Sequence, residues 1–162
     1  MPKLSGNGRS FLPKVFNGNF SHLSSPLFKR QIVDKVGLFD NEMSAVADYH
    51  FLLRCVIAEA NFYYHDTQGT YSLVRWHPGN MSKDPSFMRS EEIKMRQSLT
   101  PDIEQTGNKA AIEANRNAIK ALSIMTRKTW RKKFLSGGPF DFIKKGLRII
   151  GLEKMARKIF YK

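Results

Sequence analysis

The sequence changes character near Pro101, and this change limits the folds that the chain can adopt. Residues 1–100 hold all the histidines, most tyrosines and most turn dipeptides, whereas residues 101–162 are rich in helix formers. The first part has 12 Lys and Arg against 9 Asp and Glu, and the second has 15 against 5, giving net charges of +3 and +10. A chain of 162 residues forms one ordinary domain or a modest domain with an appendage. We therefore expect a mixed α/β part at 1–100 and a basic helical tail at 101–162.

Local patterns refine this division into elements. Hydrophobic periodicity predicts helices at 30–36, 46–60, 87–99, 109–134 and 140–150. Gly37 follows the first of these helices, as a C-terminal cap does. Aromatic and β-branched runs predict strands at 62–65 and 70–76, and residues 5–10 and 20–28 read as a loop and an extended segment.

The compartment follows from what the sequence lacks. Cys55 is the only cysteine, so an intramolecular disulfide is excluded and a reducing compartment fits. The first ten residues are not followed by the apolar stretch of a secretory signal peptide. No segment approaches the roughly 20 apolar residues of a membrane span. We expect a cytoplasmic protein, with the inner face of the plasma membrane as the place of any membrane contact.

The basic tail at 101–162 suggests an anionic partner. In the predicted helix at 140–150, one face is apolar and the other is basic; the apolar residues are Phe140, Ile143, Leu147 and Ile150, and the basic ones are Lys144, Lys145 and Arg148. This pattern is typical of a helix lying at the headgroup level of a membrane. Two alternatives to membrane contact stay open. The apolar face packs on residues 1–100, or, as the less favoured alternative, the tail binds nucleic acid.

Four motifs occur in order between residues 24 and 82: SSPLFKR at 24–30, VGLFD at 36–40, ADYHFLLR at 47–54 and YSLVRWHPGNMS at 71–82. Together they resemble the C-terminal half of family 2 glycosyltransferases, which have the GT-A fold. The resemblance covers roughly two fifths of the chain. It implies an α/β fold in which residues 1–100 are the C-terminal, acceptor-side part of a catalytic domain, with an appended helical tail.

Asp48 matches the position of the family's general base. The resemblance implies that it takes a proton from the acceptor hydroxyl, which attacks the sugar with inversion. A helix N-terminus favours a negative charge in the first turn, and a base must be ionised to act. The other interpretation is that Asp48 only caps the helix at 46–60. Many relatives carry an acidic residue just before this Asp, whereas this chain has Ala47.

Arg75 and His77 match the family's R-x-H element. The resemblance implies that His77 approaches a divalent metal, Mn²⁺ or Mg²⁺, and that both residues lie near the diphosphate of a nucleotide-sugar donor. Imidazole is a suitable metal ligand, and guanidinium suits a phosphate. The alternative is a histidine satisfied by backbone carbonyls before the turn at Pro78 and Gly79.

The family's nucleotide-binding half, with its Asp-x-Asp metal motif, has no counterpart here, since no Asp-x-Asp occurs in the sequence. We therefore expect a fragment of a glycosyltransferase, inactive alone, that acts on a glycan or a lipid-linked acceptor. The alternative function is a non-catalytic basic helical module that binds a membrane surface or nucleic acid.

Overall fold

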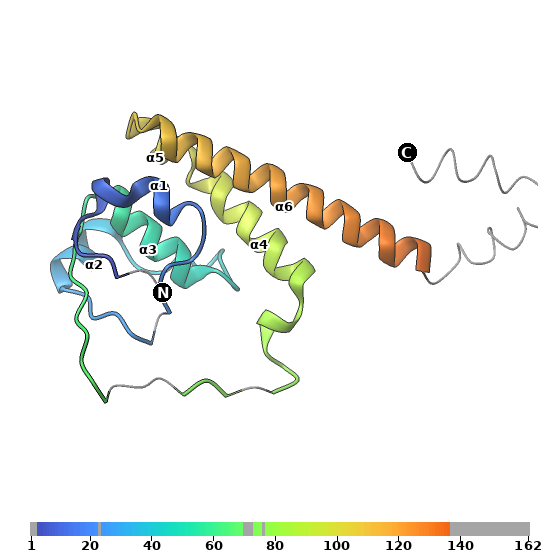
Figure 1. Ribbon diagram of the computed structural model, residues 1–162, viewed down its shortest axis with the longest axis horizontal. Coiled ribbons are helices and arrows are strands. Elements are labelled where there is room, and N and C mark those ends of the chain that lie inside the picture. Colours follow the sequence, from blue (N-terminus) through green and yellow to red (C-terminus); the bar gives the residue numbers. More distant parts are fainter. Residues whose placement is uncertain (1–2, 23, 70–72, 76, 137–162) are drawn as a thin grey trace, which may run out of the picture. The chain divides into compact units, whose positions relative to one another are not determined.

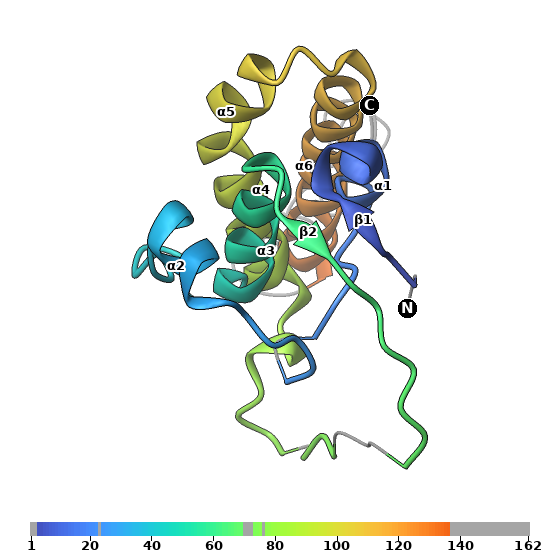
Figure 2. The same cartoon turned by 90° about the vertical axis from the view of Figure 1, so that its left-hand side faces the viewer.

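The computed structural model describes residues 3–22, 24–69, 73–75 and 77–136. It separates into two units, Met1–Ser123 and Ile124–Lys162, each considered by itself below. The described residues are mostly helical (Figure 1), with a small two-stranded sheet (Figure 2). Among them, no helix is both long and apolar enough to cross a bilayer.

The described residues form two short strands, two 3-10 helices and six α-helices. The two strands are β1 (Gly6–Asn7) and β2 (Asn61–Phe62), and the two 3-10 helices are η1 (Gly8–Phe11) and η2 (Met81–Lys83). The α-helices are α1 (Leu12–Val15), α2 (Arg30–Val36), α3 (Ala47–Ile57), α4 (Pro85–Ser98), α5 (Thr100–Gln105) and α6 (Lys109–Ser136).

The core of the first unit surrounds α3. Leu53 and Val56 of α3 are fully buried, together with Phe16 from the end of α1 and Met95 from α4. Ile103 and Ala111 belong to the same cluster although they follow Pro101. Burying such side chains stabilises a fold by about 1.5–3 kcal/mol each. The boundary expected at residues 100 and 101 stays a prediction, and the structure itself divides after Ser123.

The predicted helices at 30–36, 46–60, 87–99 and 109–134 are confirmed as α2, α3, α4 and α6, with ends shifted by a few residues. Gly37 ends α2 with a φ of 81°, a left-handed conformation that glycine adopts without strain. Asp84 caps α4, since its carboxylate accepts hydrogen bonds from the amides of Ser86 and Phe87. The predicted helix at 140–150 lies outside the described residues.

The observed strands differ from the predicted ones in their length and in the segments that pair. Residues 5–10 are not a loop but contain β1, which pairs antiparallel with β2. Residues 63–65 and 73–75 are in no strand, so of the strands predicted at 62–65 and 70–76 the described residues contain only Phe62 in β2. The strand partner is distant in the sequence: Gly6 and Asn7 pair with β2, and Gly8 donates its amide to the carbonyl of Ala60.

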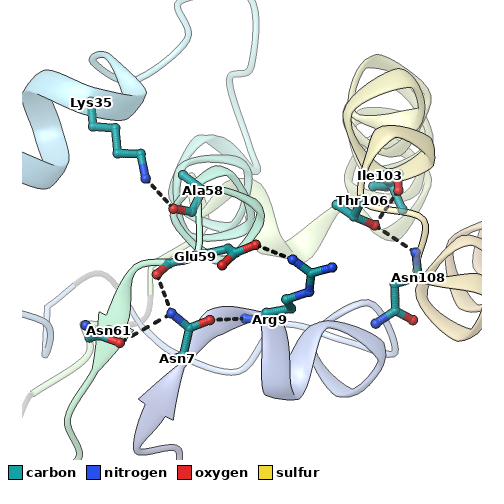
Figure 3. Close-up of polar contacts among 9 residues, drawn as sticks. All are labelled: Asn7, Arg9, Lys35, Ala58, Glu59, Asn61, Ile103, Thr106 and Asn108. Atoms are coloured by element: carbon teal, nitrogen blue, oxygen red, sulfur yellow. Dashed lines mark hydrogen bonds and ion pairs between the residues drawn. The ribbon is translucent and has the colours of Figure 1, made fainter.

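A cluster of polar contacts holds β1 against the residues that follow α3 (Figure 3). The side-chain amide of Asn7 donates to the carbonyl of Glu59 at 2.8 Å, and Arg9 pairs with the Glu59 carboxylate at 2.9 Å. Glu59 has a φ of 59°, which a non-glycine residue rarely adopts, and these two contacts hold it there. Gly8 fits because a Cβ would stand 2.7 Å from the carbonyl oxygen of Val56.

Candidate functional site

Three of the four motifs converge on one aromatic ring, that of Phe51 in α3. Phe28 packs edge-on against it with ring centres 5.1 Å apart, and Phe39 stacks at 4.7 Å in a tilted arrangement. Phe51 itself is 2% exposed. Aromatic pairs in such geometries stabilise by about 0.5–1.5 kcal/mol beyond the area they bury. The motifs at 24–30, 36–40 and 47–54 therefore form one cluster, which we call the Phe51 cluster.

Arg54 fixes the second motif to the third. Its guanidinium donates to the carbonyl of Val36 at 2.7 Å and to the carbonyl of Leu38. These carbonyls lie at and beyond the end of α2, where a helix leaves acceptors unsatisfied and favours positive charge. The same guanidinium lies over the Phe51 ring, 5.6 Å from its centre. The arginine that closes the ADYHFLLR motif thus has a structural role in the Phe51 cluster.

Asp48 lies in the first turn of α3, as predicted, and is half-buried. The residue at the N-cap is Val46, whose side chain cannot cap, and the Oδ1 of Asp48 accepts the amide hydrogen of Tyr49 at 2.7 Å. Among the described residues the Asp48 carboxylate forms no ion pair. The carboxylate therefore satisfies one amide at the helix start and can still accept a further hydrogen bond from a hydroxyl group.

Two residues further along, His50 is buried beside Asp40, the last residue of the VGLFD motif. Its Nδ1 stands 3.8 Å from a carboxylate oxygen of Asp40 and has no hydrogen-bond partner in the described part of the chain. Burial lowers the pKa of His50, the Arg54 guanidinium lowers it further, and Asp40 and Asp102 oppose the shift. His50 is therefore neutral at physiological pH.

The other side of α3 is held by a network that the sequence did not indicate. Arg96 of α4 is 1% exposed, and it donates to Glu92 at 2.7 Å and to the carbonyl of Phe16 at 2.9 Å. It also approaches the hydroxyl of Tyr49, which donates to the carbonyl of Val15 at 2.6 Å. Burial raises the pKa of Tyr49 to about 12. The residue next to Asp48 is thus anchored to α1 and α4.

The loop that leads into α3 is also attached to α4. Glu91 accepts hydrogen bonds from the amide of Ser44 at 3.0 Å and from its hydroxyl at 2.8 Å. These hydrogen bonds lower the pKa of Glu91. Lys94 donates to the carbonyl of Glu42 in the same loop. The loop and the first turn of α3 are therefore positioned by side chains that come from α4.

Arg75 and His77 lie between β2 and η2, in a segment whose described residues form no helix or strand and lie apart from α3 in Figures 1 and 2. Both side chains are exposed. The Asn80 side chain donates to the carbonyl of Arg75 at 3.1 Å, and Asn80 donates its amide to the carbonyl of His77 at 3.2 Å. The resemblance also implies that the side chains of Asp48 and His77 face one cleft. None of the described contacts joins Arg75 or His77 to Asp48, so this stays a prediction.

The described residues do not by themselves fit a divalent metal. His77 offers one imidazole, and no group of three or more His, Cys, Asp or Glu side chains gathers among residues 3–22, 24–69, 73–75 and 77–136. Two hollows in the surface of the first unit lie along α5 and α6 and include none of the three predicted site residues.

The arrangement combines a fixed carboxylate at the start of α3 with an exposed Arg and His on a loop. Chemically, the carboxylate can accept a proton from a hydroxyl, and the loop residues can contact an anion. Comparison of the chain with models of protein families, with curated proteins and with solved structures finds no significant match.

Proposed function

We propose that the chain supplies the acceptor side of an inverting glycosyltransferase of the family 2 type, with Asp48 as the general base. The observation that carries this proposal is the Phe51 cluster: three motifs that are separate in the sequence pack together, and Asp48 stands in the first turn of the helix they surround. The GT-A arrangement of the whole enzyme is part of the same proposal.

The chemistry assigned to Asp48 is a single proton transfer. An acceptor hydroxyl on a glycan or lipid-linked saccharide attacks the anomeric carbon of a nucleotide-sugar, and its proton passes to the carboxylate. The bond between the anomeric carbon and the diphosphate oxygen breaks, and the nucleoside diphosphate leaves with the electron pair. Attack from the opposite face gives inversion. Positioning matters for such a base, and the contacts of Tyr49 and of the loop before α3 provide it.

Arg75 is proposed to contact the donor diphosphate, since guanidinium binds phosphate oxygens in a bidentate manner. His77 is the one proposed ligand for Mn²⁺ or Mg²⁺, which would supply charge neutralisation for the leaving diphosphate when bound. No step is assigned to the metal, because the described residues provide no set of ligands. The donor-binding part is proposed to come from sequence other than these 162 residues.

The competing interpretation makes Asp48 only a helix-start residue that accepts the Tyr49 amide. The chain contains a matched control: Asp102 lies in the first turn of α5 as Asp48 lies in the first turn of α3. If the first-turn position were all that mattered, Asp48→Asn and Asp102→Asn would have similar and small effects on stability and none on activity.

The experiment measures the transfer of labelled sugar from a set of nucleotide-sugars in cell extracts. The extracts come from source cells in which each variant replaces the gene at its own locus, so that any donor-binding part is present. We expect Asp48→Asn to lower turnover by about 10²–10⁴ while donor binding changes little. Asp102→Asn should leave turnover unchanged. Equal turnover in the two variants at equal protein levels would overturn the role of Asp48.

A further inference from the structure

The division of the structure after Ser123 locates the charge excess more sharply than the sequence did. Residues 1–123 hold 15 of the 27 Lys and Arg and 12 of the 14 Asp and Glu. Residues 124–162 hold the other 12 Lys and Arg and the other 2 Asp and Glu. The net charges are therefore +3 for the first unit and +10 for the second. Residues 101–123 hold three basic and three acidic residues, so the second unit carries the whole excess of the tail.

The second unit has few anions of its own to pair with its cations. In the first unit, ion pairs join Lys3 to Asp66, Arg9 to Glu59, Arg30 to Asp34, Lys94 to Glu42 and Arg96 to Glu92. In the second unit, the described cations Arg127 and Lys128 are exposed and form no ion pair with any described residue. Twelve cations share Asp141 and Glu153, so most of them have no anion within their unit with which to pair.

The apolar content of the second unit distinguishes between anionic partners. Its 39 residues include 16 large apolar ones: Ile124, Met125, Trp130, Phe134, Leu135, Phe140, Phe142, Ile143, Leu147, Ile149, Ile150, Leu152, Met155, Ile159, Phe160 and Tyr161. Two of them have a described exposure: Ile124 is 44% and Met125 is 53% exposed. Nucleic-acid backbones attract cations but offer little to aliphatic side chains. A bilayer interface accepts both the cations and the apolar groups.

We propose that the second unit, residues 124–162, binds the surface of an anionic lipid membrane. Its cations contact headgroup phosphates and carboxylates, and its apolar side chains enter the boundary between headgroups and acyl chains. The first unit takes no part in this contact. The proposal is independent of the glycosyltransferase function, because it uses none of Asp48, Arg75 and His77 and its readout requires no activity.

The test is co-sedimentation of the full chain with vesicles of phosphatidylcholine alone or mixed with phosphatidylserine. Binding should require phosphatidylserine and weaken between about 0.1 and 1 M salt, where the screening length falls from roughly 10 to 3 Å. The test variant is Arg127→Glu with Lys128→Glu. Its matched control is Arg116→Glu with Lys120→Glu, which changes two exposed cations of the same helix that belong to the first unit.

We expect the test variant to bind anionic vesicles on the order of tenfold more weakly, since two attractive charges become repulsive, and the control to bind as wild type does. Circular dichroism melts of both variants confirm that they fold. Equal losses in the two variants would overturn the assignment to residues 124–162. Equal binding to neutral and anionic vesicles would overturn the electrostatic contact, and tighter binding to a DNA or RNA duplex than to vesicles would identify nucleic acid as the partner.

Discussion

Helix α3 and the loop after β2 both carry residues proposed to act in catalysis, but their surroundings differ. Around α3, Phe51 contacts two other motifs, Arg54 binds two carbonyls, and Tyr49 is anchored to α1 and α4. In the loop, Leu73 is 97% and Val74 65% exposed, and Arg75 and His77 are exposed as well. The fold therefore fixes Asp48, whereas packing in the described chain does not fix Arg75 or His77.

This difference separates two kinds of site residue. A general base has to be held in place before the substrate arrives, because misplacement by about 1 Å can cost 10²-fold in rate. A residue that contacts the donor can instead be ordered by the donor itself. On this account, substitutions around α3 reduce stability, and substitutions in the loop change only binding.

The largest effect is expected at Arg96, the buried cation behind Tyr49. Arg96→Ala removes the contacts to Glu92, Phe16 and Tyr49, and we expect the free energy of unfolding to fall by about 3–5 kcal/mol. Chemical denaturation measures this change. Arg75→Ala, the loop control, should leave the denaturation midpoint where it is. A loss below about 1 kcal/mol at Arg96 would show that α3 does not depend on this network.

A smaller effect is expected at Gly8, which faces the end of α3. Gly8→Ala places a Cβ against the Val56 backbone, and we expect a loss of about 1–3 kcal/mol. Gly18→Ala is the matched control, because nothing lies within 4 Å of its Cβ position. Thermal melts of both variants measure the difference. Equal melting temperatures would mean that β1 and η1 are not held against α3.

The pH dependence of stability tests the burial of His50. Because the folded pKa lies below 6.5, the unfolded state binds more protons once the pH falls below about 6.5, and folding is disfavoured. Stability should therefore fall as the pH drops through 6.5 and level off below the folded pKa. The contribution of Glu91, whose pKa is lowered, is lost only below its ordinary 4.5.

The melting temperature of the wild type should decrease as the pH is lowered from 7.5 to 5.5, a range that spans the ordinary histidine pKa of about 6.5. The melting temperature of His50→Gln should change less over the same range. His65→Gln, which changes an exposed histidine, should retain the wild-type slope. A His50→Gln slope that equals the wild-type slope would assign the pH dependence to other groups.

The smallest effect is expected in the loop. Leu73→Ser replaces an exposed leucine, and we expect a change in unfolding free energy within about 0.5 kcal/mol. A loss of about 2 kcal/mol, typical of a buried leucine, would show that the loop is packed in solution and would end the contrast with α3.

The sequence predicted α2, α3, α4 and α6, because their signals are local, but it did not predict the short helices α1 and α5. Gly37 at the end of α2 and Asp84 before Pro85 mark helix ends through backbone geometry and capping. The strands depended on partners distant in the sequence, so the pairing of β1 with β2 was missed. The placement of Asp48 in a first helical turn was predicted. The burial of Arg96 was not, since a charged residue within a helix carries no local signal of its tertiary partners.

The Phe51 cluster is preformed and fixes α3, and no contact among the described residues attaches it to the loop. Native-state hydrogen exchange measures both regions in one sample. We predict that the amides of Leu53, Arg54 and Val56 exchange only through global unfolding, and that those of Leu73, Val74 and Arg75 exchange nearly as fast as in an unfolded chain. Protection of the three loop amides equal to that of α3, or rapid exchange throughout α3, would contradict the account.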